Sequence, residues 1–436
     1  MNTISSQNPF FETYSTLHST VPFDKIKTGD YVPAIREGIR RQNAEIEAII
    51  RNPEVPTFAN TVLAYEKSGE MLHRVSTVFG NLLSAETDDD LQELAKEIMP
   101  MMSEHENNIS LNEELFARIK AVYEQQDKET LSPEQHKLLE DIYNGFVRNG
   151  ANLLGEDKEK YRALCKELSL LTLQFSENNL KETNDYKLVI TDKSQLAGLP
   201  ESAVEAAAET AGEKGVEGWV FTLQAPSYGP FLTYADSRDL RRELYMAYNT
   251  KCTHDNASNN LEIVKKLANV RMEIAQLLGY DNFAEYNLQE RMAQNSESVY
   301  KLLDQLLEAY TPTAKQEYAE VQALARQAEG EDFVLMPWDW AYYSHKLKDR
   351  KFNIDDELLR PYFELNNVKQ GVFGLATRLY GITFKKNPDI PVYHKDVDAY
   401  EVFDKDGKFL AVFYTDFHPR AGKRSGAWMT SYKEQS

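Results

Sequence analysis

Two short stretches of the sequence combine residue types that suit ligand binding. Residues 336–352 read MPWDWAYYSHKLKDRKF, which places two tryptophans, two tyrosines, a histidine and an aspartate within ten positions. Aromatic rings most often complete a core, but beside ionisable groups they also suit the wall of a substrate channel. Because neighbouring residues on a helix point ~100° apart, we expect Tyr342 and Tyr343 to divide these roles, with one ring packed inward and the other facing the channel.

The second stretch is GKRSGAW, residues 422–428. Gly422 and Gly426 permit backbone torsions or close approaches that other residues resist. Lys423 and Arg424 are cations that could hold a peptide carboxylate through charge-assisted hydrogen bonds. The alternative is a basic surface turn whose side chains pair with acidic neighbours, an outcome that we expect more for Lys423 than for Arg424.

The familiar sequence patterns of catalytic sites are missing. No two of the eight histidines lie four residues apart on a helix, the spacing by which two imidazoles bind one zinc ion. The nearest pattern is HENNI, where Ile109 stands in place of the second histidine, and we interpret it as a solvated helix face. The sequence also has no Gly-rich phosphate loop and no G-x-S-x-G nucleophile turn. No catalytic or metal-binding residue can therefore be named.

Charge and composition exclude several classes of protein. Lysine and arginine total 49 against 69 aspartates and glutamates, a formal charge of −20. Nucleic acid and anionic membrane surfaces would on average be repelled. Two cysteines are too few for a disulfide framework. The N-terminal residues do not resemble a secretion signal and no stretch of about 18 apolar residues occurs, so we expect a cytoplasmic protein without a membrane segment.

Helical periodicity predicts the elements that must position the two stretches. The length of 436 residues exceeds what one core supports, so two lobes are expected. Apolar stripes along the first 185 residues predict an N-terminal helical lobe. Thr57 is placed to cap one helix, and Ser132, Pro133 and Gln135 match a capping box at another. Residues 186–332 predict a mixed and then helical segment, in which 296–329 is a polar, Ala- and Glu-rich helix.

Short β-like runs interrupt this helical pattern. YKLVI and GWVFTL lie between residues 186 and 232, and AYEVFDKDGKFLAVFYTDF alternates on both sides of Asp406-Gly407, which predicts a hairpin. Residues 333–436 are expected to form a further segment with the aromatic helix, the hairpin and the GKRSGAW turn. The fold class predicted from these patterns is mainly α, with a small β-sheet near the C-terminus.

Taken in order along the chain, these motifs resemble the thimet-oligopeptidase family of zinc metallopeptidases. PWDWAYY is similar to the W-D-x-x-Y-Y segment of the family, and DFHPRAGKRSGAWM is similar to its D-x-x-x-R-x-G-K-x-x-G-A run. RRELYMAYNTK, LANVRMEIAQLLGYDNFAEY and the N-terminal NPFF-to-PFDKIKTGDYVPAI stretch add separated matches, the last most similar to bacterial peptidyl-dipeptidases. The resemblance covers essentially the whole chain.

The resemblance implies a helical ellipsoid with a deep channel, a zinc site at its floor and cleavage of short peptides, in the peptidyl-dipeptidase branch by removal of C-terminal dipeptides. In the family the H-E-x-x-H helix and the third zinc ligand follow the G-K-x-x-G-A run, whereas this sequence ends at Ser436. We therefore expect the N-terminal part of such an enzyme, inactive alone and without bound zinc. The substrate-binding residues implied are Trp338, Tyr342, Tyr343, Gly422, Arg424 and Gly426.

Two alternatives to the peptidyl-dipeptidase remain open from the sequence. One is an endopeptidase like oligopeptidase A, and the other is a helical peptide-binding module without hydrolysis. If the chain is a part of the enzyme, apolar surface meant for the remainder should be exposed. We expect that surface partly at residues 333–345 and 408–432, together with self-association.

Overall fold

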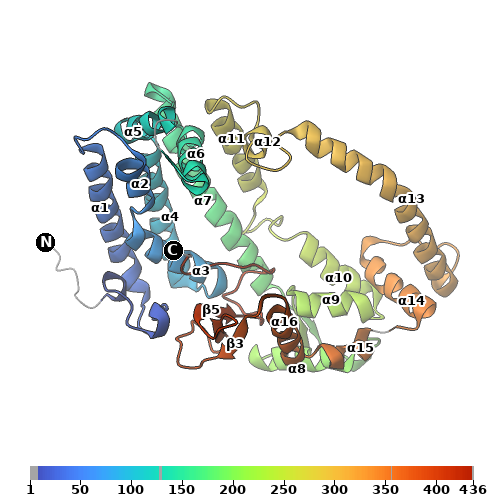
Figure 1. The fold of residues 1–436 in the computed structure, drawn as a ribbon. Coiled ribbons are helices and arrows are strands. Elements are labelled where there is room, and N and C mark those ends of the chain that lie inside the picture. Colours follow the sequence, from blue (N-terminus) through green and yellow to red (C-terminus); the bar gives the residue numbers. More distant parts are fainter. Residues whose placement is uncertain (1–7, 127–129, 355, 435–436) are drawn as a thin grey trace. The chain divides into compact units, whose positions relative to one another are not determined.

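The computed structural model describes residues 8–126, 130–354 and 356–434. The chain divides into two compact units (Figure 1). The first unit comprises Met1–Phe175, Ile263–Tyr286 and Phe384–Ser436, and the second comprises Ser176–Glu262 and Asn287–Thr383. The division into 1–185, 186–332 and 333–436 stays a prediction, and its two outer limits lie outside the described residues.

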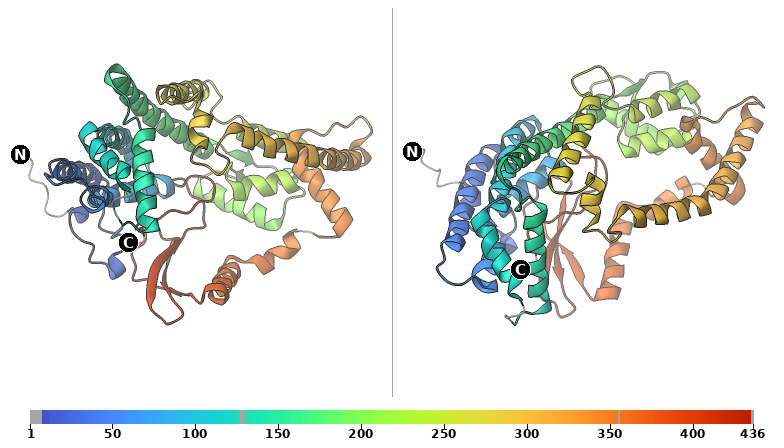
Figure 2. Two further views of the ribbon diagram at one scale, coloured as in Figure 1. Left: turned by 45° about the horizontal axis from the view of Figure 1, so that its top comes forward. Right: turned by 90° about the horizontal axis from the view of Figure 1, so that it is seen from above.

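The mainly α fold predicted from the sequence is confirmed, and most of the first unit is helical (Figures 1 and 2). Its helices are α1 Tyr31–Ile50, α2 Leu63–Glu66, α3 Glu70–Ala85, α4 Asp89–Ser110, α5 Glu113–Glu124, α6 Pro133–Arg148, α7 Gly155–Asp185, α11 Leu261–Leu277 and α12 Phe283–Leu288. The last ten residues of α7 lie beyond the limits of the unit, as do a few residues of α11 and α12. Short turns of 3-10 helix precede them at η1 Pro9–Phe11, η2 Leu17–Ser19 and η3 Thr28–Asp30.

The predicted helix caps are present. Thr57 Oγ1 accepts a hydrogen bond from Asn60 N at the start of the π-helical turn η4, Phe58–Val62. Ser132 and Gln135 form the capping box of α6, with Pro133 as its first residue. Each cap satisfies backbone donors that a helix start would otherwise leave unpaired. These local interactions are readable from sequence because they involve residues only three positions apart.

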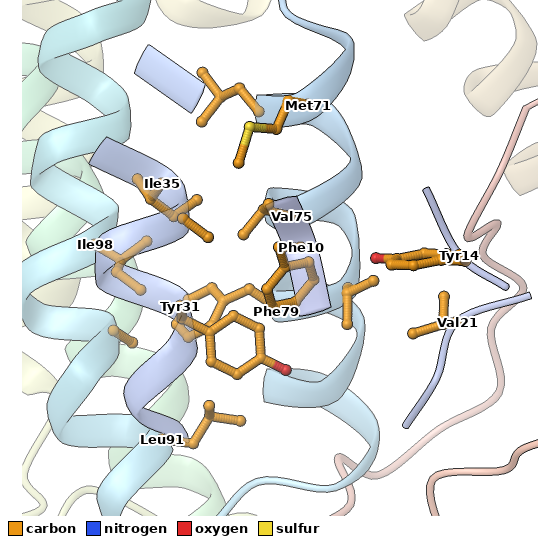
Figure 3. Close-up of a cluster of buried hydrophobic side chains, with 14 residues drawn as sticks. Phe10, Tyr14, Val21, Tyr31, Ile35, Met71, Val75, Phe79, Leu91 and Ile98 are labelled. Carbon is orange, nitrogen blue, oxygen red and sulfur yellow. The ribbon is translucent and has the colours of Figure 1, made fainter. Parts of the chain in front are cut away.

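The largest core of the first unit forms between α1, α3, α4 and the N-terminal turns (Figure 3). Tyr31 and Ile35 of α1 face Val75 and Phe79 of α3, and the ring of Phe10 packs beside Tyr31 at a centroid distance of 5.4 Å. All five side chains are almost fully buried. The apolar stripes predicted for these helices thus meet each other, as amphipathic faces must.

One surface prediction in this unit is wrong. The HENNI segment of α4 is not a solvated face, because His105 is 3% exposed and Ile109 is also buried. His105 Nε2 lies 2.7 Å from Oε1 of Gln42 on α1, and burial lowers the pKa of the imidazole. The histidine is therefore a core residue whose polar atom has a partner in another helix.

The second unit combines helices with a two-stranded sheet. Strands β1 Leu188–Ile190 and β2 Trp219–Phe221 pair antiparallel, with Val189 opposite Val220, at the two positions where short strands are predicted. The helices of this unit are α8 Glu201–Glu213, α9 Ala225–Tyr234, α10 Arg238–Asn249, α13 Ser296–Glu329, α14 Trp340–Phe352, α15 Asp356–Leu359 and α16 Leu365–Tyr380. Three 3-10 turns complete it: η6 Lys193–Leu196, η7 Pro337–Asp339 and η8 Arg360–Phe363.

A three-stranded sheet lies near the C-terminus, with strand order β3-β4-β5. Its strands are β3 Thr383–Lys386, β4 Asp398–Phe403 and β5 Phe409–Thr415. The predicted hairpin is confirmed, because β4 and β5 pair antiparallel around a turn in which Gly407 has a φ of 78°. In the described sheet β5 has a neighbour on one side, so its other edge carries backbone groups that no strand pairs.

No helix in the described part of the chain has the length and apolar character needed to cross a membrane.

Candidate functional site

The PWDWAYY segment is organised by a buried aspartate. Asp339, at the end of η7, has no exposed surface. Arg238 Nη2 lies 2.7 Å from its Oδ2, and Arg241 Nη2 lies 3.1 Å from its Oδ1, so that two arginines of α10 converge on one carboxylate. The backbone N–H of Met336 also donates to Oδ2. We call Asp339, Arg238 and Arg241 the Asp339 cluster.

The surroundings keep this buried carboxylate ionised. Burial alone would raise the pKa of Asp339, but hydrogen bonds from Arg238, the Met336 backbone and Arg241 leave it below its ordinary value. Arg241 is itself only 1% exposed and donates further hydrogen bonds to the carbonyls of Ala235 and Asp236. Asp339 and Arg241 thus form a buried pair whose donors and acceptors are used within the fold, whereas Arg238 is partly exposed.

The two tyrosines of the segment both lie in the core, which corrects the expectation that one of them faces a channel. Tyr342 is 8% exposed and donates its hydroxyl to Asp236 at 2.7 Å, while Tyr343 is 2% exposed and donates to Glu329 at 2.8 Å. Their rings stand perpendicular, 5.0 Å apart. The 100° turn between them separates two buried environments, because α13 and the α9–α10 region each cover one side of α14.

The tryptophans of the segment are less enclosed. Trp338 is half-buried beside Tyr245 and under the guanidinium of Arg242. Trp340 is 41% exposed and stacks almost parallel on Tyr318 of α13. The exposed ring of this segment is therefore Trp340, a position that the sequence interpretation did not select.

The GKRSGAW turn follows a second aspartate, in the first unit. Asp416 accepts hydrogen bonds from Arg420 Nη2 at 2.8 Å, Lys423 Nζ at 2.9 Å and the Tyr393 hydroxyl at 3.0 Å. Burial alone would raise the pKa of Asp416, but these three donors lower it to about 2. We call Asp416, Arg420, Lys423 and Tyr393 the Asp416 cluster. Asp416, Arg420 and Lys423 are the D, R and K of the D-x-x-x-R-x-G-K pattern.

The same turn is attached to the end of α3. Arg420 donates to the carbonyl of Ala85 and pairs with Glu86. The backbone N–H of Thr87 donates to the Gly422 carbonyl at 2.8 Å. A Cβ atom on Gly422 would lie 2.3 Å from the Thr87 carbonyl oxygen, so only glycine fits this approach.

The second glycine of the turn is required for a different reason. Gly426 has a φ of 113°, a conformation that side chains other than glycine rarely adopt, and an added Cβ would meet open space. The two roles expected for the glycines, a close approach and an unusual torsion, are both present. Gly422 has the first role and Gly426 the second.

The two cations of the turn differ in what they contact. Lys423 is held by Asp416 and by the carbonyl of His418, as the alternative interpretation expected. Arg424 donates its backbone N–H to Ser84 O, and its exposed guanidinium lies 4.8 Å above the Trp428 ring. No ion pair joins Arg424 to a carboxylate among the described residues. Its side chain can therefore bind an anion without first losing an ion-pair partner.

Edge strand β5 ends at Thr415, and six residues separate it from this turn. Leu410 and Phe413 of the strand are exposed, and Phe417 just after it is 53% exposed. The ring of His18 stacks on Phe409 at a centroid distance of 3.6 Å, and its Nε2 lies 2.7 Å from a Glu401 oxygen, so the N-terminal segment rests on the sheet. An extended peptide could pair with the open edge of β5 by main-chain hydrogen bonds.

The structure gathers the six predicted site residues into two sets. Trp338, Tyr342 and Tyr343 lie in the second unit, and Gly422, Arg424 and Gly426 lie in the first. In the described residues no three His, Cys, Asp or Glu side chains approach closely enough to hold a metal ion. These residues therefore do not fit the zinc ion that the family resemblance implies, and no chemical step through zinc can be assigned to them.

Comparison with known proteins gives a consistent result. Residues 231–436 match the sequence profile described as Peptidase family M3. The chain is 39% identical over 436 residues to "Dipeptidyl carboxypeptidase" of Escherichia coli (strain K12), a match that covers 99% of this chain and 64% of that protein. It is 33% identical over 412 residues to "Oligopeptidase A" of the same organism, covering 94% of this chain and 60% of that protein.

More distant relatives extend beyond bacteria. "Thimet-like oligopeptidase" of Dictyostelium discoideum is 26% identical over 412 residues, covering 91% of this chain and 60% of that protein. In each of these comparisons nearly all of the present chain is matched, and it spans somewhat under two thirds of the relative.

Proposed function

Because the chain belongs to the thimet-oligopeptidase family, peptidase family M3, we propose that it forms the peptide-binding part of a zinc-dependent peptidase that removes dipeptides from the C-termini of short peptides. The zinc ligands and the general base lie outside the residues described here. The 436 residues bind peptide and do not hydrolyse it alone. A cytoplasmic location remains part of this proposal.

The observation that carries the proposal is a cation without an acidic partner among the described residues, in a turn that follows an open strand in the sequence. Arg424 has no acidic partner among the described residues, whereas Lys423, next to it, is occupied by Asp416. A peptide lying along β5 would make main-chain hydrogen bonds with the strand edge. Its terminal carboxylate would then accept hydrogen bonds from the Arg424 guanidinium, which suits a carboxylate better than an ammonium does.

The Asp416 cluster contributes by holding the turn in place. With a pKa of about 2, Asp416 is ionised at neutral pH and keeps Lys423 turned toward the fold. Gly422 allows the turn to approach Thr87, and Gly426 adopts a backbone conformation that other residues rarely take. Arg424 is thereby the cation of this turn that remains available to substrate.

The test compares peptides that differ only at the C-terminus. Binding of a short peptide with a free carboxylate and of its C-terminal amide is measured by calorimetry for the 436-residue chain and for Arg424→Ala. A charge-assisted hydrogen bond at this exposed position is worth about 1.5 kcal/mol, so we expect a preference of about tenfold for the free acid, lost in the variant. Lys405→Ala removes an exposed cation from the β4–β5 turn and should leave the preference unchanged.

The identity to oligopeptidase A supports a second candidate, an endopeptidase that does not read the C-terminus. That candidate predicts equal binding of acid and amide by the unmodified chain, and an equal loss for both in Arg424→Ala. Either result would reject the dipeptide-removing function and favour the endopeptidase.

A further inference from the structure

A pocket of about 320 Å³ lies within the first unit. Its lining comes from residues 23–28 of the N-terminal segment, the first residue of α1, the end of α3, the start of α4 and residues 392–393. It borders the Asp416 cluster at Tyr393, but none of the six predicted site residues lines it. Pockets of about this volume and larger hold small molecules in proteins. The pocket is therefore a second place at which this unit can bind a ligand.

Much of the pocket wall is apolar. The ring of Phe23 meets the ring of Tyr393 edge-on at a centroid distance of 5.4 Å. The aliphatic side chains of the wall are Ile26, Leu82, Leu91 and Val392. Contact with such a wall removes the apolar body of a small ligand from water, which favours binding without fixing its orientation. The orientation must come from the polar groups of the pocket.

One of these polar groups is the buried hydroxyl of Tyr31. Tyr31 is 3% exposed, and it also lines the pocket. Figure 3 shows its hydroxyl at the end of the core that holds Leu91, opposite Met71. No hydrogen bond joins this hydroxyl to another residue in the described part of the chain. Because buried polar groups are rarely left without a partner, the hydroxyl is a position at which a polar atom of a ligand would be bound.

The remaining polar groups of the pocket are mainly acidic. Asp24, Glu86 and Asp88 line it, together with the exposed Lys27. Glu86 is paired with Arg420, and Asp88 uses one oxygen to cap α4. Two more carboxylates in the first turn of α4 offset the positive end of that helix. The local charge therefore favours a cation over an anion.

We propose that this pocket binds a small primary amine with an apolar body. The ammonium group donates hydrogen bonds to the carboxylates of Asp24 and Asp88 and to the hydroxyl oxygen of Tyr31, while the apolar body packs on the wall. An ammonium has three N–H donors, which equals the number of these acceptors. An anion would have Lys27 as its partner but would face the carboxylates. This site goes beyond the proposed peptidase function, because it uses none of the residues assigned to peptide binding.

The test compares three probes that share one phenyl group. Binding of phenethylamine, 2-phenylethanol and 3-phenylpropanoate to the 436-residue chain is measured by titration calorimetry at neutral pH. The three carry a positive, a neutral and a negative terminus on a similar apolar body. We expect phenethylamine to bind at least about tenfold more tightly than either of the others, since hydrogen bonds between charged groups are the stronger ones.

Two substitutions remove acceptors while keeping the local structure. Tyr31→Phe retains the ring, and Asp88→Asn retains a side chain that can cap α4. Each should weaken the binding of phenethylamine about threefold to tenfold. Tyr14→Phe removes a buried hydroxyl of the same core that does not line the pocket, and Asp90→Asn removes an exposed charge from α4. These two controls should change binding less than about twofold.

Urea unfolding of the same variants separates ligand binding from stability. Tyr31→Phe should not lower the midpoint of unfolding, because the hydroxyl has no partner within the described fold. A large loss of stability would show that the hydroxyl has a structural role, and would overturn the proposal.

The binding data can overturn the proposal in four further ways. Equal binding of the amine and the alcohol would show an apolar pocket that does not recognise a cation. Tighter binding of 3-phenylpropanoate would assign the pocket to an anion held by Lys27. Equal effects of the acceptor and control substitutions would place the amine elsewhere on the chain, and the absence of binding by all three probes would reject the site.

Discussion

The Asp339 cluster and the Asp416 cluster use the same chemistry in different settings. Each joins one aspartate to two cationic side chains, and each lies in a sequence motif of the family. In the second unit the carboxylate of Asp339 and the guanidinium of Arg241 are both essentially inaccessible. In the first unit Asp416, Arg420 and Lys423 retain between 11% and 13% of their side-chain surface.

The difference shows which motif serves the fold alone and which can also serve a ligand. Every polar atom that Asp339 and Arg241 present is used internally, so the PWDWAYY segment is held as part of a core. The Asp416 cluster fixes a turn at the surface and leaves the next residue, Arg424, exposed.

The largest effect should come from breaking the more buried cluster. Asp339→Asn removes the charge that compensates Arg241, and an unpaired buried charge typically costs about 3–5 kcal/mol. We expect a loss of that size in the free energy of unfolding, measured in urea. Asp332→Asn is the matched control, since Asp332 is exposed in the same unit and should change stability by less than about 0.5 kcal/mol. Equal effects of the two substitutions would refute the difference in burial on which the comparison rests.

A smaller, pH-dependent effect is expected from the Asp416 cluster. The pKa of Asp416 is about 2 in the folded protein against an ordinary value of 3.8. A carboxyl with a depressed folded pKa stabilises the fold above its unfolded pKa, and this contribution is lost as the pH falls from about 4 to about 2. Asp416→Asn should therefore cost about 1–2 kcal/mol at pH 7 and progressively less across that window.

Unfolding curves at pH 7, 4 and 2.5 measure this contribution. Asp406→Asn, in the exposed turn of the same hairpin, is the control with the same chemical change. A cost of Asp416→Asn that stays constant from pH 7 to pH 2.5 would show that the carboxylate is not held ionised by its cationic neighbours.

Gly422 tests whether the turn is fixed to α3 by backbone approach as well as by charge. A Cβ at this position would lie 2.3 Å from the Thr87 carbonyl oxygen, so Gly422→Ala must displace the backbone, at about 1–3 kcal/mol. Gly80→Ala is the control, because Gly80 lies within α3 with open space around it and alanine favours a helix there. We expect destabilisation for the first and a neutral or stabilising effect for the second, measured by thermal unfolding. A neutral Gly422→Ala would mean that the turn is not held close to Thr87.

Local patterns could be predicted from the sequence, and long-range partners could not. The capping box at Ser132 and the hairpin around Asp406-Gly407 depend on residues a few positions apart, and both are present. The burial of His105 was missed because its partner, Gln42, is 63 residues away. Asp339 and its partners on α10 are about a hundred residues apart in the sequence. Arg238 and Arg241 therefore could not be identified from the sequence as partners of a buried carboxylate.

The average composition of residues 296–329 hid an exposed apolar face. The range 296–329 was described as polar because its second half is rich in alanine and glutamate, yet its first half holds six large apolar residues on one side. A shorter window restricted to 299–310 reveals the stripe. Which side of a helix remains uncovered depends on the rest of the fold and cannot be obtained from periodicity.

The smallest effect on stability should come from Arg424, and it sharpens the comparison between the clusters. The guanidinium contacts the Trp428 ring at an exposed position, an interaction worth about 0.5 kcal/mol. Arg424→Ala should therefore leave the free energy of unfolding nearly unchanged, whereas Lys423→Ala, which removes a hydrogen-bond donor from Asp416, should cost about 1–2 kcal/mol. Urea unfolding of both variants under the same conditions makes the measurement. If Arg424→Ala destabilises the fold as much as Lys423→Ala does, the two cations share a structural role and Arg424 is not reserved for a ligand.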